Sequence, residues 1–274
     1  MKKFRFLFVS GVLLLALGAC QRDEIAVDDN ESVILQETLS EEIMVEVDAL
    51  VEEAIDLKLN TEKSGIDDGD FYLNSCPIIT YYKNADPQVI IIDFGTGCQG
   101  KDGKVRSGKI MISSSKFENA TAERVKTFDD FYVEGKKVEG VVNKTITVDR
   151  EDHIKVAEIE EDLTFIFPDD GGTAQRKAIM TRKYELNTLG VARDNIITSW
   201  GVVEFTRVNG IMITKTINET TPLIFKVLCH RIVSGIVAVK TSDNRSWTID
   251  YGNGECDNIA TVMCGNNTKI IRLR

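Results

Sequence analysis

The chain has 274 residues, 43 acidic and 33 basic side chains, a formal net charge of −10 and two histidines. This length is enough for one large β domain or two small ones with a sizeable core. The sequence contains no basic stripe and no cluster of Lys or Arg, which argues against nucleic acid as a partner. With two histidines and no C-x-x-C spacing, a zinc site is not expected either, and we expect no cofactor.

Residues 1–19 have the features of a secretory signal peptide. Three basic residues precede an apolar stretch of about a dozen residues, shorter than the ~20 that a transmembrane helix needs. The stretch ends in "LGAC", which resembles a bacterial lipobox, so we expect lipidation of Cys20 and attachment of the mature chain to a membrane through its acyl chains. The alternative is an ordinary signal cleaved near Ala19, with Cys20 incidental.

The acidic residues are concentrated directly after the signal. Residues 20–60 hold thirteen acidic against two basic residues, whereas residues 61–274 hold thirty against twenty-eight. This predicts a nearly neutral body on an acidic stalk. Gln21 after the cysteine favours the outer membrane, and "RDEIAVDDNE" resembles a surface-export signal of Bacteroidetes-type bacteria; a solvated tether is the alternative. We expect a surface-facing rather than a periplasmic protein.

Residues 31–59 predict one amphipathic helix, which ends the acidic segment 20–60. Its apolar face is formed by Ile43, Val47, Leu50, Ala54 and Leu57. Acidic residues fill the other face. We expect the apolar face to dock on the body, with binding to a partner protein as the alternative. Residues 61–70 read as a linker that leads into a β-rich domain, 71–274.

The β-rich domain consists of short β-branched and aromatic runs separated by turn residues. Alternation is clear in "TITVD" and "KVAEIE", and breakers such as "PDDGG" and "TSDN" have hairpin spacing. No β-α-β period occurs, which excludes a parallel α/β sheet. The expected fold is mainly β: a long antiparallel sheet, a sandwich or a half-open barrel, with the one N-terminal helix.

An internal repeat joins the start and the end of this domain. "VIIIDFGTGCQG" and "SWTIDYGNGECDN" share apolar residues, Asp, an aromatic residue, Gly-x-Gly and Cys. Each motif follows a cysteine, a strand and a hairpin turn, and a polar turn and another strand ("KIMIS" or "KIIRL") come after it. The repeat units are residues 76–115 and 229–274.

The cysteine spacing predicts a disulfide in each repeat unit. Cys76 lies 22 residues before Cys98, and Cys229 lies 27 before Cys256. Strands of an antiparallel hairpin bring such residues within disulfide reach, and closing each loop stabilises by ~3 kcal/mol in the chain-entropy model. Cys264 is the thiol left over, and we expect it to be buried and inert.

Asp93 and Asp250 occupy the same place in the two motifs. Both are weak calcium candidates, but one carboxylate per motif is far short of the six to eight oxygen ligands of calcium. A structural turn that precedes the disulfide is the favoured interpretation, because Gly95 and Gly252 can adopt positive φ there.

No catalytic motif appears, and we expect the protein not to be an enzyme. His153 and His230 have no motif partner, and adjacent acids such as Glu160 and Glu161 point to opposite faces of a strand. A glycan-acting hydrolase therefore stays a minor alternative. Six aromatic residues can either mark a glycan-binding face or pack in the core, which we favour: Tyr81, Tyr82, Phe131, Tyr132, Trp200 and Trp247.

The blocks "DFGTGC…DGKVRSGKI" and "IVSG…DYGNGECDN" make nearly the whole mature chain resemble a family of uncharacterised Bacteroidetes outer-membrane lipoproteins. The resemblance implies a lipidated, β-rich envelope protein and brings no activity with it. The expected function is a non-catalytic binding or envelope-structural role at the cell surface, with a glycan or a protein as possible partner. A carrier of an apolar ligand in a curved sheet is the alternative.

Overall fold

The computed structural model describes residues 40, 43–55, 73, 76–168, 171–185, 196–226, 229 and 231–273. Within these residues a long antiparallel sheet of fifteen strands packs against a helix over residues 43–55. The mainly β fold is thus confirmed, and of the expected architectures it is the long antiparallel sheet. The signal peptide, Cys20, the linker 61–70, His230 and the ends of the predicted helix, including Leu57, lie outside the described residues.

In chain order the strands are β1 (Ile78–Tyr82), β2 (Gln88–Asp93), β3 (Cys98–Gln99), β4 (Val105–Ser114), β5 (Thr121–Val133), β6 (Lys136–Asp149), β7 (Ile154–Ile166), β8 (Thr173–Glu185), β9 (Ile196–Thr206), β10 (Met212–Ile217), β11 (Leu223–Lys226), β12 (Arg231–Thr241), β13 (Ser246–Asn253), β14 (Ile259–Cys264) and β15 (Asn267–Arg272).

Nearly every strand pairs with its neighbours in sequence, as expected of a chain of hairpins. The order across the sheet is β1-β2-β4-β5-β6-β7-β8-β9-β10-β12-β13-β14-β15, and β3 pairs with β4. β10 pairs with the second half of β9 and β11 with its first half, and both also pair with β12. β10 and β11 are therefore one strand position, interrupted at residues 218–222.

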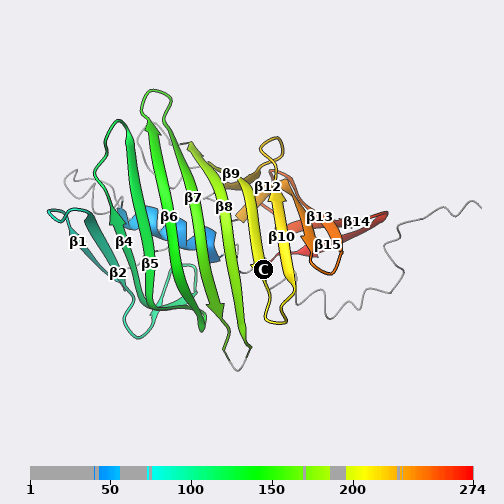
Figure 1. Cartoon of the computed structure of the whole chain (residues 1–274), viewed down its shortest axis with the longest axis horizontal. Coiled ribbons are helices and arrows are strands. Elements are labelled where there is room, and N and C mark those ends of the chain that lie inside the picture. The colour runs from blue at the N-terminus through cyan, green and yellow to red at the C-terminus, as the bar shows by residue number, and fades with distance from the viewer. Residues whose placement is uncertain are drawn as a thin grey trace, which may run out of the picture.

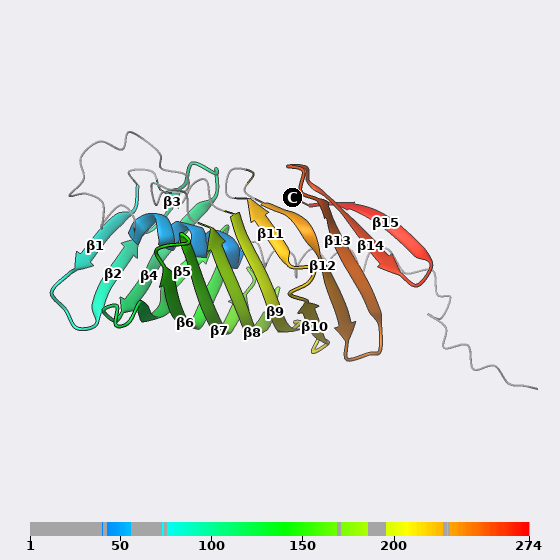
Figure 2. The same ribbon diagram turned by 90° about the horizontal axis from the view of Figure 1, so that it is seen from above.

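The sheet is curved, and the helix lies across strands β4 to β8 on the concave side (Figures 1 and 2). Glycines in strand interiors accompany this curvature. Gly140 in β6 and Gly201 in β9 have φ of 117° and 139°. A Cβ on Gly140 would collide with a carbonyl oxygen of β7, and a Cβ on Gly201 with one of β8. Such positions allow a strand to bend where a side chain would hold it straight.

Alternation along the strands separates a concave from a convex face. In β8 every second residue from Ala174 to Tyr184 is buried, whereas Lys177 and Ile179 between them are exposed. Apolar side chains of the sheet and the helix form one core on the concave side. Each fully buried Val, Leu, Ile or Phe contributes roughly 1.5–3 kcal/mol to stability.

The helix is buried more completely than the sequence predicts. Ile43, Val47, Leu50 and Ala54 belong to the core, in agreement with the predicted apolar face. However, no described residue of the helix is exposed, and its acidic Asp48 is as buried as the apolar side chains. Basic side chains of the sheet pair with these acids of the helix, whereas residues 20–39 of the predicted acidic segment lie outside the described residues.

The two repeat units form matching hairpins, β1–β2 and β12–β13. One detail of the predicted repeat is wrong. The predicted polar turn after the second motif is the segment "DNIATVMCGNN", residues 257–267. This segment instead contains strand β14, which separates β13 from β15. β4, the partner of β2, therefore corresponds to β14 and not to β15. Apolar residues in this segment alternate weakly, and Ala260 is the one that reaches the core.

Candidate functional site

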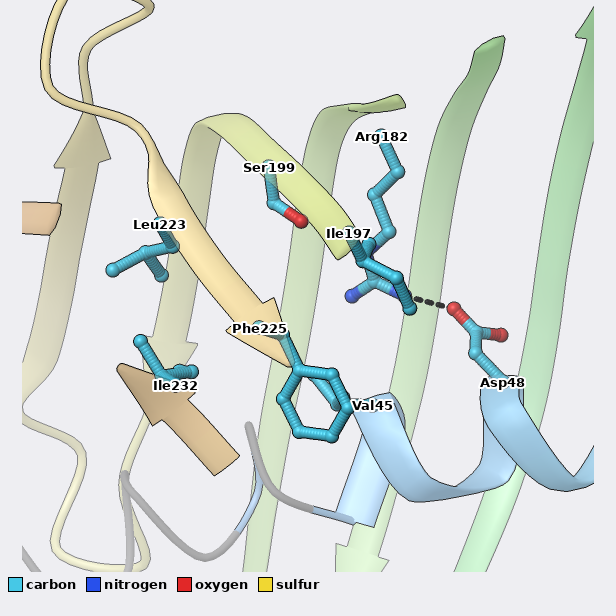
Figure 3. A pocket seen from close by; sticks show the side chains of 8 residues that line it. All are labelled: Val45, Asp48, Arg182, Ile197, Ser199, Leu223, Phe225 and Ile232. Carbon is cyan, nitrogen blue, oxygen red and sulfur yellow. Dashed lines mark hydrogen bonds and ion pairs between the residues drawn. The ribbon is translucent and has the colours of Figure 1, made fainter. Parts of the chain in front are cut away.

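Asp48 is the centre of a buried set of charges between helix and sheet. Its Oδ1 lies 2.6 Å from Lys126 Nζ on β5 and 2.8 Å from Lys144 Nζ on β6. Its Oδ2 pairs with Arg182 on β8, as Figure 3 shows. All four side chains are 4% exposed or less, so water contributes little to these contacts.

Glu52 extends the same arrangement by one helical turn. Residues four apart lie on the same side of a helix, so Glu52 faces the sheet next to Asp48. Its Oε1 accepts a hydrogen bond from Arg124 on β5 at 2.9 Å, and its Oε2 accepts one from Lys155 on β7 at 2.7 Å. We refer to Asp48, Glu52, Arg124, Lys126, Lys144, Lys155 and Arg182 as the helix ion-pair cluster.

Glu46 contacts the sheet from another side of the helix, because residues two apart point in nearly opposite directions. It pairs with Lys104, which precedes β4, and lies 3.5 Å from Arg106 on β4. Arg106 is 2% exposed and also donates two hydrogen bonds to Asp102, at 2.6 and 3.0 Å. The helix is therefore bound by charges on two sides.

The surrounding cations keep the acids of the cluster ionised. Burial by itself would raise the pKa of Asp48, but Lys126, Lys144 and Arg182 outweigh it and hold that pKa well below its usual value. Burial likewise opposes ionisation of Glu52, yet Lys155 and Arg124 lower its pKa to about 2. Burial lowers the pKa of Lys126, against the attraction of Asp48.

Each carboxylate of the cluster connects the helix to several basic side chains of the sheet, Asp48 to three and Glu52 to two. Removing one partner of such a buried set leaves an uncompensated charge, which is strongly destabilising, whereas an intact set mainly specifies one arrangement. The chemistry of these residues is therefore electrostatic: they fix the position and the rotation of the helix. A second buried pair, Arg176 Nε to Glu161 Oε2 at 2.8 Å, links β8 to β7 nearby.

A small pocket lies beside the cluster, where Val45 and Asp48 of the helix approach β8, β9, β11 and β12 (Figure 3). The lining residues are Val45, Asp48, Arg182, Ile197, Ser199, Leu223, Phe225 and Ile232. Its volume is about 10 Å³, which is about the space of one water molecule. A drug-sized ligand needs a pocket of several hundred cubic ångströms.

The two predicted disulfides are present. Cys76 bonds to Cys98 with Cα atoms 5.8 Å apart, and Cys229 bonds to Cys256 with Cα atoms 5.5 Å apart. Each closes the base of its hairpin. Cys264 belongs to neither disulfide; it is half-exposed rather than buried, and its thiol donates to the Ser246 carbonyl at 3.5 Å.

Asp93 and Asp250 have the same structural task in the two motifs. The Oδ1 of Asp93 accepts the N–H of Gly95, and that of Asp250 accepts the N–H of Gly252, both at 2.9 Å. Each Asp thus closes its own turn after the strand. The aromatic residue that follows each Asp is buried. No group of three or more His, Cys, Asp or Glu side chains in the described part of the chain is arranged to hold a metal ion.

The remaining candidates are dispersed. His153 is exposed in the turn between β6 and β7, and Glu160 is exposed while the adjacent Glu161 is buried, as the strand geometry predicts. Of the six aromatic residues, Phe131 is fully buried and Tyr82 is 52% exposed. The other four are half-buried, and they are Tyr81, Tyr132, Trp200 and Trp247.

The helix ion-pair cluster is absent from the predictions, although the sequence carries a signal for it. Arg124 and Lys126 share the strand parity of the buried Ala122. Arg182 likewise shares the parity of Met180 and Tyr184 on β8. Basic residues at inward positions, combined with one acidic helix, indicate paired charges in the core.

No family model, no curated protein and no solved structure matches this chain. Among the described residues, no helix has the length and apolar character to cross a membrane.

Proposed function

We propose that this chain is a lipid-anchored, non-catalytic protein of a bacterial outer membrane, facing the cell surface, with a binding or envelope-structural role. The lipobox at Cys20 would supply the anchor, and the acidic residues after it would direct export to the surface. The β-rich body would then be presented to glycans or proteins outside the cell.

The observation that supports the non-catalytic part of this proposal is the enclosure of the buried charges. Acids of the helix pair with basic side chains at the centre of the sheet, and the adjacent pocket has room for about one water molecule. A hydrolase needs carboxylates that a substrate can reach. Charges arranged in this way fix the structure of the β-rich body. This favours a function that the surface of the body performs.

The two disulfides support export of the body. Disulfides persist in oxidising compartments and are rare in the bacterial cytosol. The two clamps close hairpins near opposite ends of the sheet (Figure 1). This is consistent with a chain that matures beyond the inner membrane.

The carrier alternative has a curved sheet and a helix in its favour. Its difficulty is space, because the pocket on the concave side is far smaller than an acyl chain requires. A ligand would have to displace a helix that buried charges hold in place. We therefore favour binding at the surface over transport in the interior.

The deciding experiment is proteinase K treatment of intact cells, followed by mass spectrometry of the remaining peptides. Cleavage at the cell surface, with a periplasmic protein left intact, is expected. Purified protein treated with the same protease amount controls for a body that resists cleavage. Protection in cells together with cleavage in solution would contradict surface exposure, and a Cys20→Ala variant that stays in the membrane fraction would contradict the anchor.

A further inference from the structure

Strand β1 is an edge strand of the sheet that the structure describes. Among the described strands it pairs with β2 alone. Its residues "IITYY" carry no charge, and Ile78, Thr80 and Tyr82 are exposed, Ile78 to 70% and Tyr82 to 52%. Natural proteins usually protect edge strands with Lys, Pro, bulges or a covering element, because an open edge pairs readily with another strand.

The opposite edge of the sheet, β15, carries charged side chains within the strand, which β1 does not. Lys269 and Arg272 lie within its six residues. Its Ile270 is nevertheless 67% exposed, so the difference between the edges is one of charge rather than of apolar exposure. The lack of charge on β1 therefore calls for an explanation.

The sequence of β1 is complementary to itself in antiparallel pairing. If Thr80 lies on a two-fold axis opposite Thr80 of a second copy, Ile78 lies opposite Tyr82 and Ile79 opposite Tyr81. Pairs of an aromatic with a β-branched residue are among the favourable cross-strand pairs, and the two threonines can share a hydrogen bond. Just beyond the strand Lys83 comes opposite Pro77, so no like charges meet.

We propose that β1 is a self-association edge, at which two copies of this chain join their sheets antiparallel about Thr80. The contact is isologous and uses up the β1 edge of both copies, so it ends at a dimer. Pairing of β1 with β15 would instead leave a free edge on each copy and grow into filaments.

The contact is short, which sets the affinity that we expect. Five residues extend over ~17 Å, and such an edge buries less than the ~1,000 Å² that a stable interface should exceed. Dimers should form at high concentration in solution and be favoured where chains are crowded on a membrane. The pairing does not depend on the lipid anchor of the proposed function, so the two proposals fail separately.

Disulfide trapping tests the register directly. Residues directly opposite in an antiparallel pair have Cα atoms ~4.5–5.5 Å apart, which lies within disulfide reach. In full-length protein with Cys20→Ala and Cys264→Ser, the Thr80→Cys variant should form covalent dimers under mild oxidation. Thr268→Cys, an exposed threonine on β15, is the matched control. We expect at least ten-fold more dimer with Thr80→Cys, and equal amounts would overturn the proposal.

A second pair of variants distinguishes this register from random collision. Ile78→Cys and Tyr82→Cys should cross-link to each other when mixed, and neither should cross-link well to itself, because identical residues would lie more than ~10 Å apart. Thr80→Lys, which brings two ammonium groups face to face, should reduce the mixed cross-link at least five-fold when combined with both variants. Ladders of higher oligomers, or self-cross-linking equal to the mixed product, would overturn the two-fold pairing.

Discussion

The centre of the sheet and its two hairpin modules are held by different means. In the centre, Asp48 and Glu52 of the helix bind basic residues 72 to 134 positions further along the chain. In the modules, the disulfides join cysteines 22 and 27 residues apart, and each motif Asp bonds to an N–H two residues on. The centre is thus held by ion pairs between residues far apart in the sequence, whereas the modules are held by disulfides and turn hydrogen bonds between residues close in the sequence.

The difference shows where each kind of restraint is useful. A hairpin module closes on itself, so a local clamp can stabilise it without the rest of the body. Strands β5 to β8 have the helix as their cover, and that helix comes from the far N-terminal side of the chain. Ion pairs in the core fix how the helix sits, because a shifted or rotated helix would leave buried charges unpaired.

The largest expected effect is that of Asp48→Ala. The substitution leaves Lys126, Lys144 and Arg182 buried without their common carboxylate, which we expect to cost about 3–5 kcal/mol of unfolding free energy. Urea unfolding followed by circular dichroism measures it. The control is Asp162→Ala, whose pair with Lys177 is exposed and should contribute less than ~1 kcal/mol. Equal losses in the two variants would show that the cluster does not hold the helix.

The second-largest expected loss of stability is that on removal of either disulfide. The double variants Cys76→Ala/Cys98→Ala and Cys229→Ala/Cys256→Ala should each lose about 3 kcal/mol, because their loops have similar lengths. The two losses should agree within a few tenths of a kcal/mol in the same urea experiment. A much larger loss for one module would show that the two clamps are not equivalent.

Lowering the pH should reduce the stability of the centre of the sheet, because Glu52 becomes protonated. Its pKa is about 2 in the folded protein against an ordinary value of 4.5, so ionised Glu52 stabilises the fold above pH ~4.5 and this contribution disappears as the pH falls toward 2. At ~1.36 kcal/mol per pKa unit, the full shift corresponds to a loss of about 3 kcal/mol. Urea midpoints measured between pH 6 and pH 2.5 test this. Glu52→Gln should flatten the profile, and an unchanged slope in that variant would contradict the assignment.

The smallest losses of stability are expected from substitutions in the turns of the two repeated motifs. Asp93→Ala and Asp250→Ala each remove one carboxylate-to-amide hydrogen bond at the surface, which we expect to cost about 1 kcal/mol. Asp93→Ala also removes an exposed ion pair with Lys109, which should add less than ~1 kcal/mol. Asn at either position keeps an acceptor and should recover most of the loss. Calcium at millimolar concentration should leave the melting temperature unchanged, and a rise that disappears in both Ala variants would restore the calcium interpretation.

The predictions made from the sequence succeed where a signal is local. Strand alternation, the hairpin breakers and the equal motifs around Cys98 and Cys256 each lie within about 30 residues, and the structure contains the disulfides that they predict. The mistake on β14 has a local cause too, since its alternation is weak and Ala260 is its one buried residue.

The sequence by itself determined the mainly β class, the helix and the pairs of cysteines, because periodicity and spacing encode them directly. Tertiary structure alone decided that acids of the helix lie inside the body and that β1 is left as an uncharged edge. Which strand borders which, and which side chain faces a partner 72 or more residues away, depends on how the whole sheet curves around the helix. No window of neighbouring residues contains that information.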